Sequence, residues 1–140
     1  MCSSDLRIVS ITRHQIREVA FQALFAVNSN PDTDVMTVVD NLLEEKRVSK
    51  CPDYLRELVQ GVLSHQAELD DEIASKLSSK WTLSRLPKTD LIILRLGLYE
   101  IQNCDEIPNK VALNEALQLA KEFSDEKQRG FINGVLSNFI

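Results

Sequence analysis

The sequence predicts an all-α protein, a compact bundle of about seven helices. Apolar residues recur at the helical spacing i, i+3, i+4, i+7 along almost the whole chain. No stretch shows the sustained period-two alternation that is typical of a half-buried strand. Glycine and proline number only 4 each among 140 residues, so long uninterrupted helices are favoured.

Two helices are predicted before the first polar loop. Thr12 and Gln15 have the spacing of a capping box, and an apolar stripe over residues 16–27 follows them. A cluster of turn-forming Asn, Ser, Pro and Asp residues ends this helix. A second stripe covers residues 35–43, and the polar stretch 46–52 is expected to be a loop.

Two further helices are predicted in the middle of the chain. The third begins at residues 52–53, where a proline precedes an acid. The three consecutive acids 70–72 suit the N-terminus of a fourth helix, because the helix dipole favours negative charge there. We expect this fourth helix to carry Ile73, Leu77 and Trp81.

The last three helices are the most regular. Pro87 is well placed near the start of the fifth helix, and residues 91–101 are apolar almost all round. A helix of that kind is usually central and enclosed by others. A sixth stripe covers 111–123 and a seventh covers 131–139, with the polar segment 124–130 between them.

The sequence Gly-Val-Leu-Ser occurs twice, beginning at Gly61 and at Gly134. Each glycine lies inside a helical stripe, where it costs about 1 kcal/mol relative to alanine. Close crossing of two helices is the usual reason for such a glycine. A relic of two related three-helix halves is the alternative.

Composition limits the classes of protein that this chain could represent. A chain of this length favours one domain, expected over 12–140, and residues 1–11 are expected to be a poorly ordered extension. Three widely spaced cysteines without a CxxC motif, no signal peptide and no membrane span predict a cytoplasmic protein.

The net charge of −5 disfavours attraction to phosphate, so an RNA site would have to be a local basic patch. Composition by itself favours a protein partner.

Catalytic motifs are absent from the sequence. His14 and His65 are the only histidines, and neither has metal-ligand spacing to other ligand residues. No nucleophile elbow or glycine-rich phosphate loop occurs. The acid clusters 70–72 and 105–106 are expected to be solvated helix ends, because consecutive helical residues point in different directions. We therefore expect no enzyme, no cofactor and no metal.

The start of the first helix is rich in residues that bind phosphates and base edges. Arg13, His14 and Arg17 lie there, and Gln22 follows on the same helix. The alternative is an ordinary polar helix face. Lys110 could join this patch only if the fold brings it next to the first helix.

Four residues of the C-terminal half have two interpretations. Asp90 and Glu100 could be solvated acids, or they could belong to a partner surface. Phe123 and Phe131 flank a polar segment, where they could close the core or form a docking patch.

Several polar residues of the last third are not required by apolar patterning, namely the pairs 114–115 (Asn-Glu) and 133–134 (Asn-Gly). Together with the segment 13–25, RHQIREVAFQALF, and the segment 57–63, ELVQGVL, they make the chain resemble the NusB family of bacterial transcription antitermination factors. That resemblance implies an all-α fold of two packed helical subdomains. It also implies binding to the boxA element of ribosomal RNA leader transcripts, as a heterodimer with NusE, a small-subunit ribosomal protein. The pair joins RNA polymerase and other Nus factors and helps transcription pass terminators.

The resemblance also assigns roles to residues. Its RNA-binding positions fall on Arg13, His14, Arg17, Gln22, Phe25 and Lys110. Its partner-binding positions fall on Asp90, Glu100, Phe123 and Phe131. The family commonly has arginine at position 14, tyrosine at 25 and at 109, and an acid at 127. Lys127 places a positive charge there, and we hypothesise that it binds RNA and raises RNA affinity without the partner.

Two alternatives of other classes remain at this stage. A helical bundle that binds only proteins would agree with the net charge of −5. A NusB-like domain also occurs fused to ribosomal RNA cytosine methyltransferases, but no α/β cofactor-binding segment follows here, so a free-standing protein is expected. Some members of the family self-associate, and the sequence leaves a homodimer open.

Overall fold

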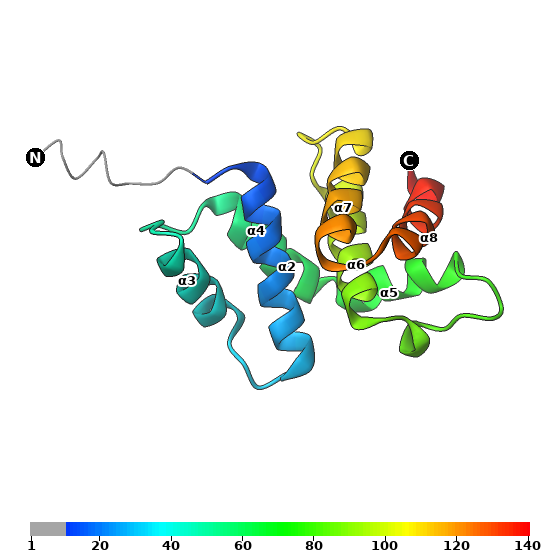
Figure 1. Cartoon of the computed structure of the whole chain (residues 1–140), viewed down its shortest axis with the longest axis horizontal. Helices are drawn as coiled ribbons and strands as arrows, with labels where there is room; N and C mark the ends of the chain where they lie inside the picture. Colours follow the sequence, from blue (N-terminus) through cyan, green and yellow to red (C-terminus); the bar gives the residue numbers. More distant parts are fainter. Residues whose placement is uncertain (1–10) are drawn as a thin grey trace, which may run out of the picture. The chain divides into compact units, whose positions relative to one another are not determined.

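A computed structural model describes residues 11–140 of the chain, and residues 1–10, which hold most of the predicted extension, lie outside the described part. Seven α-helices and two short 3₁₀ helices form the described residues, without a strand among them (Figure 1). The prediction of an all-α fold with about seven helices is therefore confirmed. The chain divides into two compact units, which meet in the sequence between Val59 and Gln60. None of the described helices is long and apolar enough to cross a membrane.

Unit 1 contains α2 (Arg13–Ser29), α3 (Val35–Glu45) and the first part of α4 (Asp53–Ser64). The predicted capping box is present: the Gln15 amide donates to Thr12 Oγ1 at 3.0 Å, and the Thr12 amide donates to Gln15 Oε1 at 2.9 Å. Two donors at the start of α2 are thereby satisfied. Helix α2 packs against α3.

Unit 2 is built around α6 (Lys88–Asn103). This helix contacts α5 (Gln66–Ser75), α7 (Asn109–Phe123) and α8 (Glu126–Leu136), and all residues from 90 to 100 are buried (Figure 1). Pro87 stands at its N-cap position, as predicted. The expectation of an enclosed central helix is confirmed.

The predicted start and end of the fourth helix are wrong. Helix α5 begins at Gln66 and ends at Ser75, so the acids 70–72 lie in its interior, and Leu77 and Trp81 lie beyond it. Contacts with another helix explain the positions of these acids, and the helix dipole does not. Two of them contact α6, and the short 3₁₀ helix η1 (Leu83–Arg85) follows in the connection to that helix.

The contact between α5 and α6 is a buried ion pair. Arg95 Nε donates to Asp70 Oδ1 at 2.7 Å, and Arg95 Nη2 donates to Asp70 Oδ2 at 2.9 Å. The Arg95 side chain is 7% exposed and that of Asp70 is 21% exposed. This bidentate geometry satisfies a guanidinium that otherwise has little access to water. About two turns further along α6, Gln102 Nε2 donates to Glu72 Oε1 at 2.7 Å.

The two repeated glycines have different environments. A Cβ atom at Gly61 would overlap the ring of Tyr99 on α6, so the predicted close helix crossing exists there. A Cβ atom at Gly134 would meet nothing within 4 Å. Close helix packing therefore does not require a glycine at position 134. The two copies of the Gly-Val-Leu-Ser sequence are not explained by one common packing constraint.

We predict that Asp70→Ala destabilises the protein by about 3–5 kcal/mol, because it leaves the buried Arg95 guanidinium without its partner. The exposed neighbour Asp71 is the matched control, and Asp71→Ala should change stability by less than about 0.5 kcal/mol. Urea denaturation followed by circular dichroism measures both values. Equal stability of the two variants would show that the ion pair does not hold α5.

Candidate functional site

The N-terminus of α2 presents one well-placed arginine. Arg13 is the first residue of the helix and is exposed. Its Cζ atom lies 4.2 Å from the centroid of the Tyr54 ring, which belongs to α4 in the same unit. A guanidinium over an aromatic face is held by cation–π attraction, so Arg13 is positioned before any ligand arrives. Nothing in the local sequence distinguishes Tyr54 from any other residue near the start of a helix, so this contact could not be predicted.

Charge at this helix end opposes the stability of the helix. The first turn of α2 has no acid, and Arg13 and His14 stand where the helix dipole is already positive. Such an arrangement is unfavourable for folding but favours an anion such as phosphate. The residue types at the start of α2 therefore suit a binding role.

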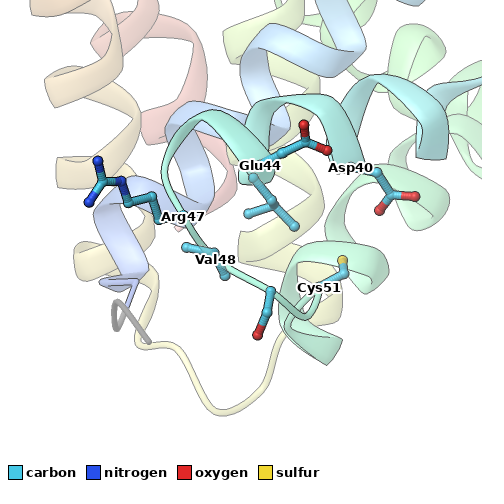
Figure 2. A pocket seen from close by; sticks show the side chains of 7 residues that line it. Asp40, Glu44, Arg47, Val48 and Cys51 are labelled. Atoms are coloured by element: carbon cyan, nitrogen blue, oxygen red, sulfur yellow. The ribbon is translucent and has the colours of Figure 1, made fainter. Parts of the chain in front are cut away.

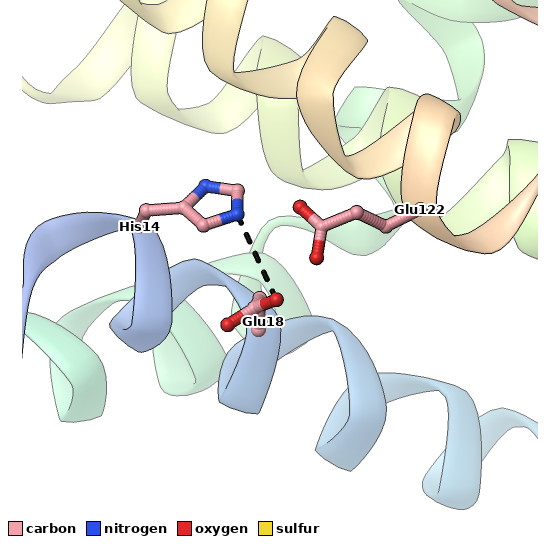
Figure 3. A group of neighbouring side chains, drawn as sticks. All are labelled: His14, Glu18 and Glu122. Atoms are coloured by element: carbon pink, nitrogen blue, oxygen red, sulfur yellow. Dashed lines mark ion pairs between the residues drawn. The ribbon is translucent and has the colours of Figure 1, made fainter.

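His14 has an acid beside it on the same helix. Its Nε2 atom lies 3.7 Å from Oε2 of Glu18, one turn along α2 (Figure 3). The His14 side chain is about one-third exposed. Glu18 reduces the positive potential around His14, so Arg13 is the stronger cation for a phosphate.

The other predicted residues of α2 differ in accessibility. Arg17 is only 3% exposed, so its guanidinium is not presented on the surface as Arg13 is. Gln22 is exposed. Phe25 is half-buried and packs edge-on against Phe21, with ring centroids 6.1 Å apart.

Lys110 and Lys127 belong to unit 2 and are both exposed. Lys110 lies in the first turn of α7, whereas Lys127 lies in the first turn of α8, just past the other end of α7. With a helical rise of 1.5 Å per residue, the length of α7 separates them by about 20 Å. They cannot contact the same phosphate.

Two of the four predicted partner-binding residues lie inside unit 2 rather than on its surface. Asp90 is fully buried, and Glu100 is 1% exposed. The Ser124 hydroxyl donates to Asp90 Oδ1 at 2.9 Å, while Asp90 Oδ2 has no hydrogen-bond partner among the described residues. Burial raises the pKa of Asp90, and the nearby charge of Asp125 adds to this rise. Neither carboxylate is therefore accessible to a partner at the surface of the unit.

The remaining two, Phe123 and Phe131, are half-buried. The ring of Phe131 lies 6.0 Å from that of Trp81, measured between centroids. Trp81 is 43% exposed and lies beyond the fourth helix, on which the sequence pattern had placed it. The polar run 78–80 immediately before it was the available signal that a helix had ended.

A pocket of about 490 Å³ lies in unit 1, in the loop that follows α3. Figure 2 shows its labelled lining residues, in which Arg47 extends away from the acids Asp40 and Glu44. Cys51 is buried there, and its burial raises the pKa of the thiol. The thiol is therefore protonated at neutral pH, and the polar groups do not converge as they do in a typical ligand site.

The fold and these surfaces define a class: an all-helical protein whose exposed arginine, lysines and aromatic pair suit binding of other macromolecules. The chain belongs to the NusB family, which it matches over residues 14–140. It is 53% identical over 134 residues to the transcription antitermination protein NusB of Levilactobacillus brevis, covering 94% of each chain. It is also 53% identical to the NusB protein of Lactiplantibacillus plantarum, covering 94% of this chain and 96% of that one.

Solved structures agree with this assignment. T. maritima NusB superimposes with a TM-score of 0.84 at 30% identity, covering 94% of this chain and 92% of that one. A second match is the crystal structure of antitermination factors NusB and NusE in complex with dsRNA. It has a TM-score of 0.78 at 27% identity and covers 92% of this chain and 97% of that chain.

We predict that the buried Asp90 makes stability depend on pH in a defined direction. Because its pKa is raised in the folded state, the folded protein holds the proton more tightly, and stability rises as pH falls from neutral toward the ordinary aspartate range. Asp90→Asn removes this titration and should be more stable than the parent at neutral pH, with the difference shrinking in acid. Urea denaturation at several pH values measures it.

Asp71→Asn, at an exposed position, is the control and should give a difference that does not change with pH. Parallel pH profiles for Asp90→Asn and the parent would contradict the assignment of this pH dependence to Asp90.

Proposed function

We propose that this protein is an RNA-binding transcription antitermination factor that binds boxA RNA of ribosomal RNA leader transcripts together with NusE. It acts in the cytoplasm, within the complex of RNA polymerase and other Nus factors, and helps transcription pass terminators. The observation that carries the proposal is the family match over residues 14–140, joined to a solved relative in which NusB is bound to NusE and dsRNA.

The start of α2 supports the RNA part of this proposal. Arg13 is exposed, positioned by Tyr54 and located at a helix N-terminus, where both side chain and backbone favour a phosphate. His14 and Gln22 add donors along the same helix, and Phe25 and Arg17 support it from less exposed positions. A local patch of this kind can bind RNA although the whole chain carries a net charge of −5.

The partner surface is proposed for unit 2, around Phe123 and Phe131. Aromatic side chains at a partly exposed position are typical of the residues that contribute most to protein interfaces. The buried Asp90 contributes by bonding Ser124, which directly follows Phe123 and ends α7. Glu100 is 1% exposed on α6, so we assign it a supporting role inside the unit and not a direct contact with the partner.

The mechanism is assembly rather than catalysis. RNA and NusE each contact the protein, so each raises the affinity for the other by the same factor if their binding is coupled. A coupling of 1–3 kcal/mol corresponds to about 5- to 150-fold in affinity. Such coupling makes formation of the antitermination complex depend on the presence of both ligands.

We predict that a short boxA-type RNA binds weakly to the protein alone and tighter by about 5- to 150-fold with NusE present. Affinity should fall as salt rises, because counterions are released from phosphates on binding. Fluorescence anisotropy of labelled RNA at several salt concentrations measures both effects. Equal affinity for a scrambled RNA would contradict specific recognition, and NusE binding without any RNA binding would favour a protein-only bundle.

Lys127 is expected to contribute to RNA affinity in the absence of NusE. Lys127→Asp should weaken binding of the isolated protein and lower the slope of log affinity against log salt by about 0.7, the value for one phosphate contact on a single strand. Lys121→Asp makes the same charge change at another exposed position and is the control. Equal loss in both variants would indicate a general charge effect and not a contact.

A further inference from the structure

The connection between α5 and α6 is the most basic segment of the described chain. Residues 76–88, hereafter the basic–aromatic loop, contain Lys76, Lys80, Arg85 and Lys88 and no acid, in a chain whose net charge is −5. No ion pair joins any of these four cations to an acid within residues 11–140. Lys76 Nζ lies 6.0 Å from the centroid of the Phe139 ring, and the charges of Lys80, Arg85 and Lys88 are available to a ligand.

Trp81 lies in the middle of this loop and is presented to solvent. It is 43% exposed, and its ring lies 6.0 Å from the ring of Phe131 on α8, between centroids. Its backbone amide donates to the carbonyl of Ser78 at 3.0 Å, and Leu86 at the end of the loop is buried. These contacts hold the indole in a definite place while leaving much of it uncovered.

Two of the cations flank Trp81 closely. Arg85 Nη1 donates to the carbonyl oxygen of Lys80 at 3.4 Å, which brings the guanidinium against the residue that precedes Trp81. Both Lys80 and Arg85 are exposed. The loop therefore combines an exposed aromatic ring with positive charge on both sides of it in the sequence, and the Arg85 guanidinium folds back to the backbone of the residue before the ring.

We propose that the basic–aromatic loop is a contact site for single-stranded RNA, in which a base stacks on Trp81 and Lys80 and Arg85 bind the neighbouring phosphates. This inference rests on the proposed function and extends it, because it gives unit 2 an RNA contact apart from Lys110 and Lys127. Aromatic rings flanked by cations are the common means by which proteins hold single strands, since every base has a face that can stack.

An acidic protein partner is the main alternative occupant, and the composition of the loop disfavours it. Lysine is depleted at protein interfaces, whereas three of the four cations of this loop are lysines and one of them, Lys80, directly precedes its only aromatic residue. The phosphates of a nucleic-acid strand bind several separated cations at once. The cations at positions 76, 80 and 85 of this loop are separated in the sequence in this way.

Trp81 is the only tryptophan of the chain, so its fluorescence reports directly on this site. Titration of the unmodified protein with unlabelled boxA-type RNA should quench that fluorescence, with the same midpoint as the anisotropy of a labelled RNA. A saturated anisotropy curve with unchanged tryptophan fluorescence would overturn the stacking proposal. Absence of any anisotropy change would instead contradict the proposed RNA-binding function itself.

Variants test the contribution of each part. Trp81→Leu keeps an apolar side chain against Phe131 and should weaken RNA binding by about 5- to 150-fold, the range for loss of one stacked base. Lys80→Gln with Arg85→Gln should lower the salt slope by about 1.4, for two phosphate contacts on a single strand. The control is Lys50→Gln with Lys121→Gln, which removes the same charge at exposed positions elsewhere. Circular dichroism checks that each variant is folded.

NusE binding in the absence of RNA completes the test. The proposal expects Lys80→Gln with Arg85→Gln, which leaves Trp81 against Phe131, to keep NusE affinity within about twofold of the parent while RNA affinity falls. Loss of NusE affinity with unchanged RNA affinity would assign the loop to the protein partner and overturn the proposal. Equal RNA affinity of the loop variants and the control pair would overturn it as well.

Discussion

The enclosure of α6 is the constraint on which the rest of unit 2 depends. Every residue from 90 to 100 is buried, and three of them are charged types: Asp90, Arg95 and Glu100. A buried charge needs a partner, because its transfer out of water costs several kcal/mol. Arg95 therefore requires Asp70 of α5 at hydrogen-bond distance, and this pair sets the register between the two helices.

The burial of charged residues on α6 also affects the proposed partner surface. Asp90, near the start of α6, accepts a hydrogen bond from Ser124, in the turn between α7 and α8. That turn separates Phe123 from Phe131, so a carboxylate inside the unit helps to place two aromatic residues near its surface. Residues that looked like surface acids in the sequence thus support the surface from within.

The proposed binding features lie where the local sequence opposes the stability of the fold. Positive residues begin α2, against the helix dipole, and the first turn of the helix contains no acid. The basic–aromatic loop leaves its cations without acids and its tryptophan partly exposed. Residues that oppose folding are expected at functional sites, because they are selected for binding a ligand and not for the stability of the protein alone.

The sequence by itself determined the helices whose signals are local. The capping box at Thr12, the proline before α6 and the all-round apolar run of that helix depend only on neighbouring residues, and each was found as predicted. The start of α5 and the exposure of Trp81 depended on contacts with α6 and α8, between residues that lie 25 to 50 positions apart in the chain. Hydrophobic periodicity shows which residues are apolar and how they are spaced. It does not show which distant residue will pair with a charged side chain, or whether an aromatic ring will stay exposed to solvent. Only the tertiary structure could therefore place Asp90 inside, Trp81 outside and Tyr54 beneath Arg13.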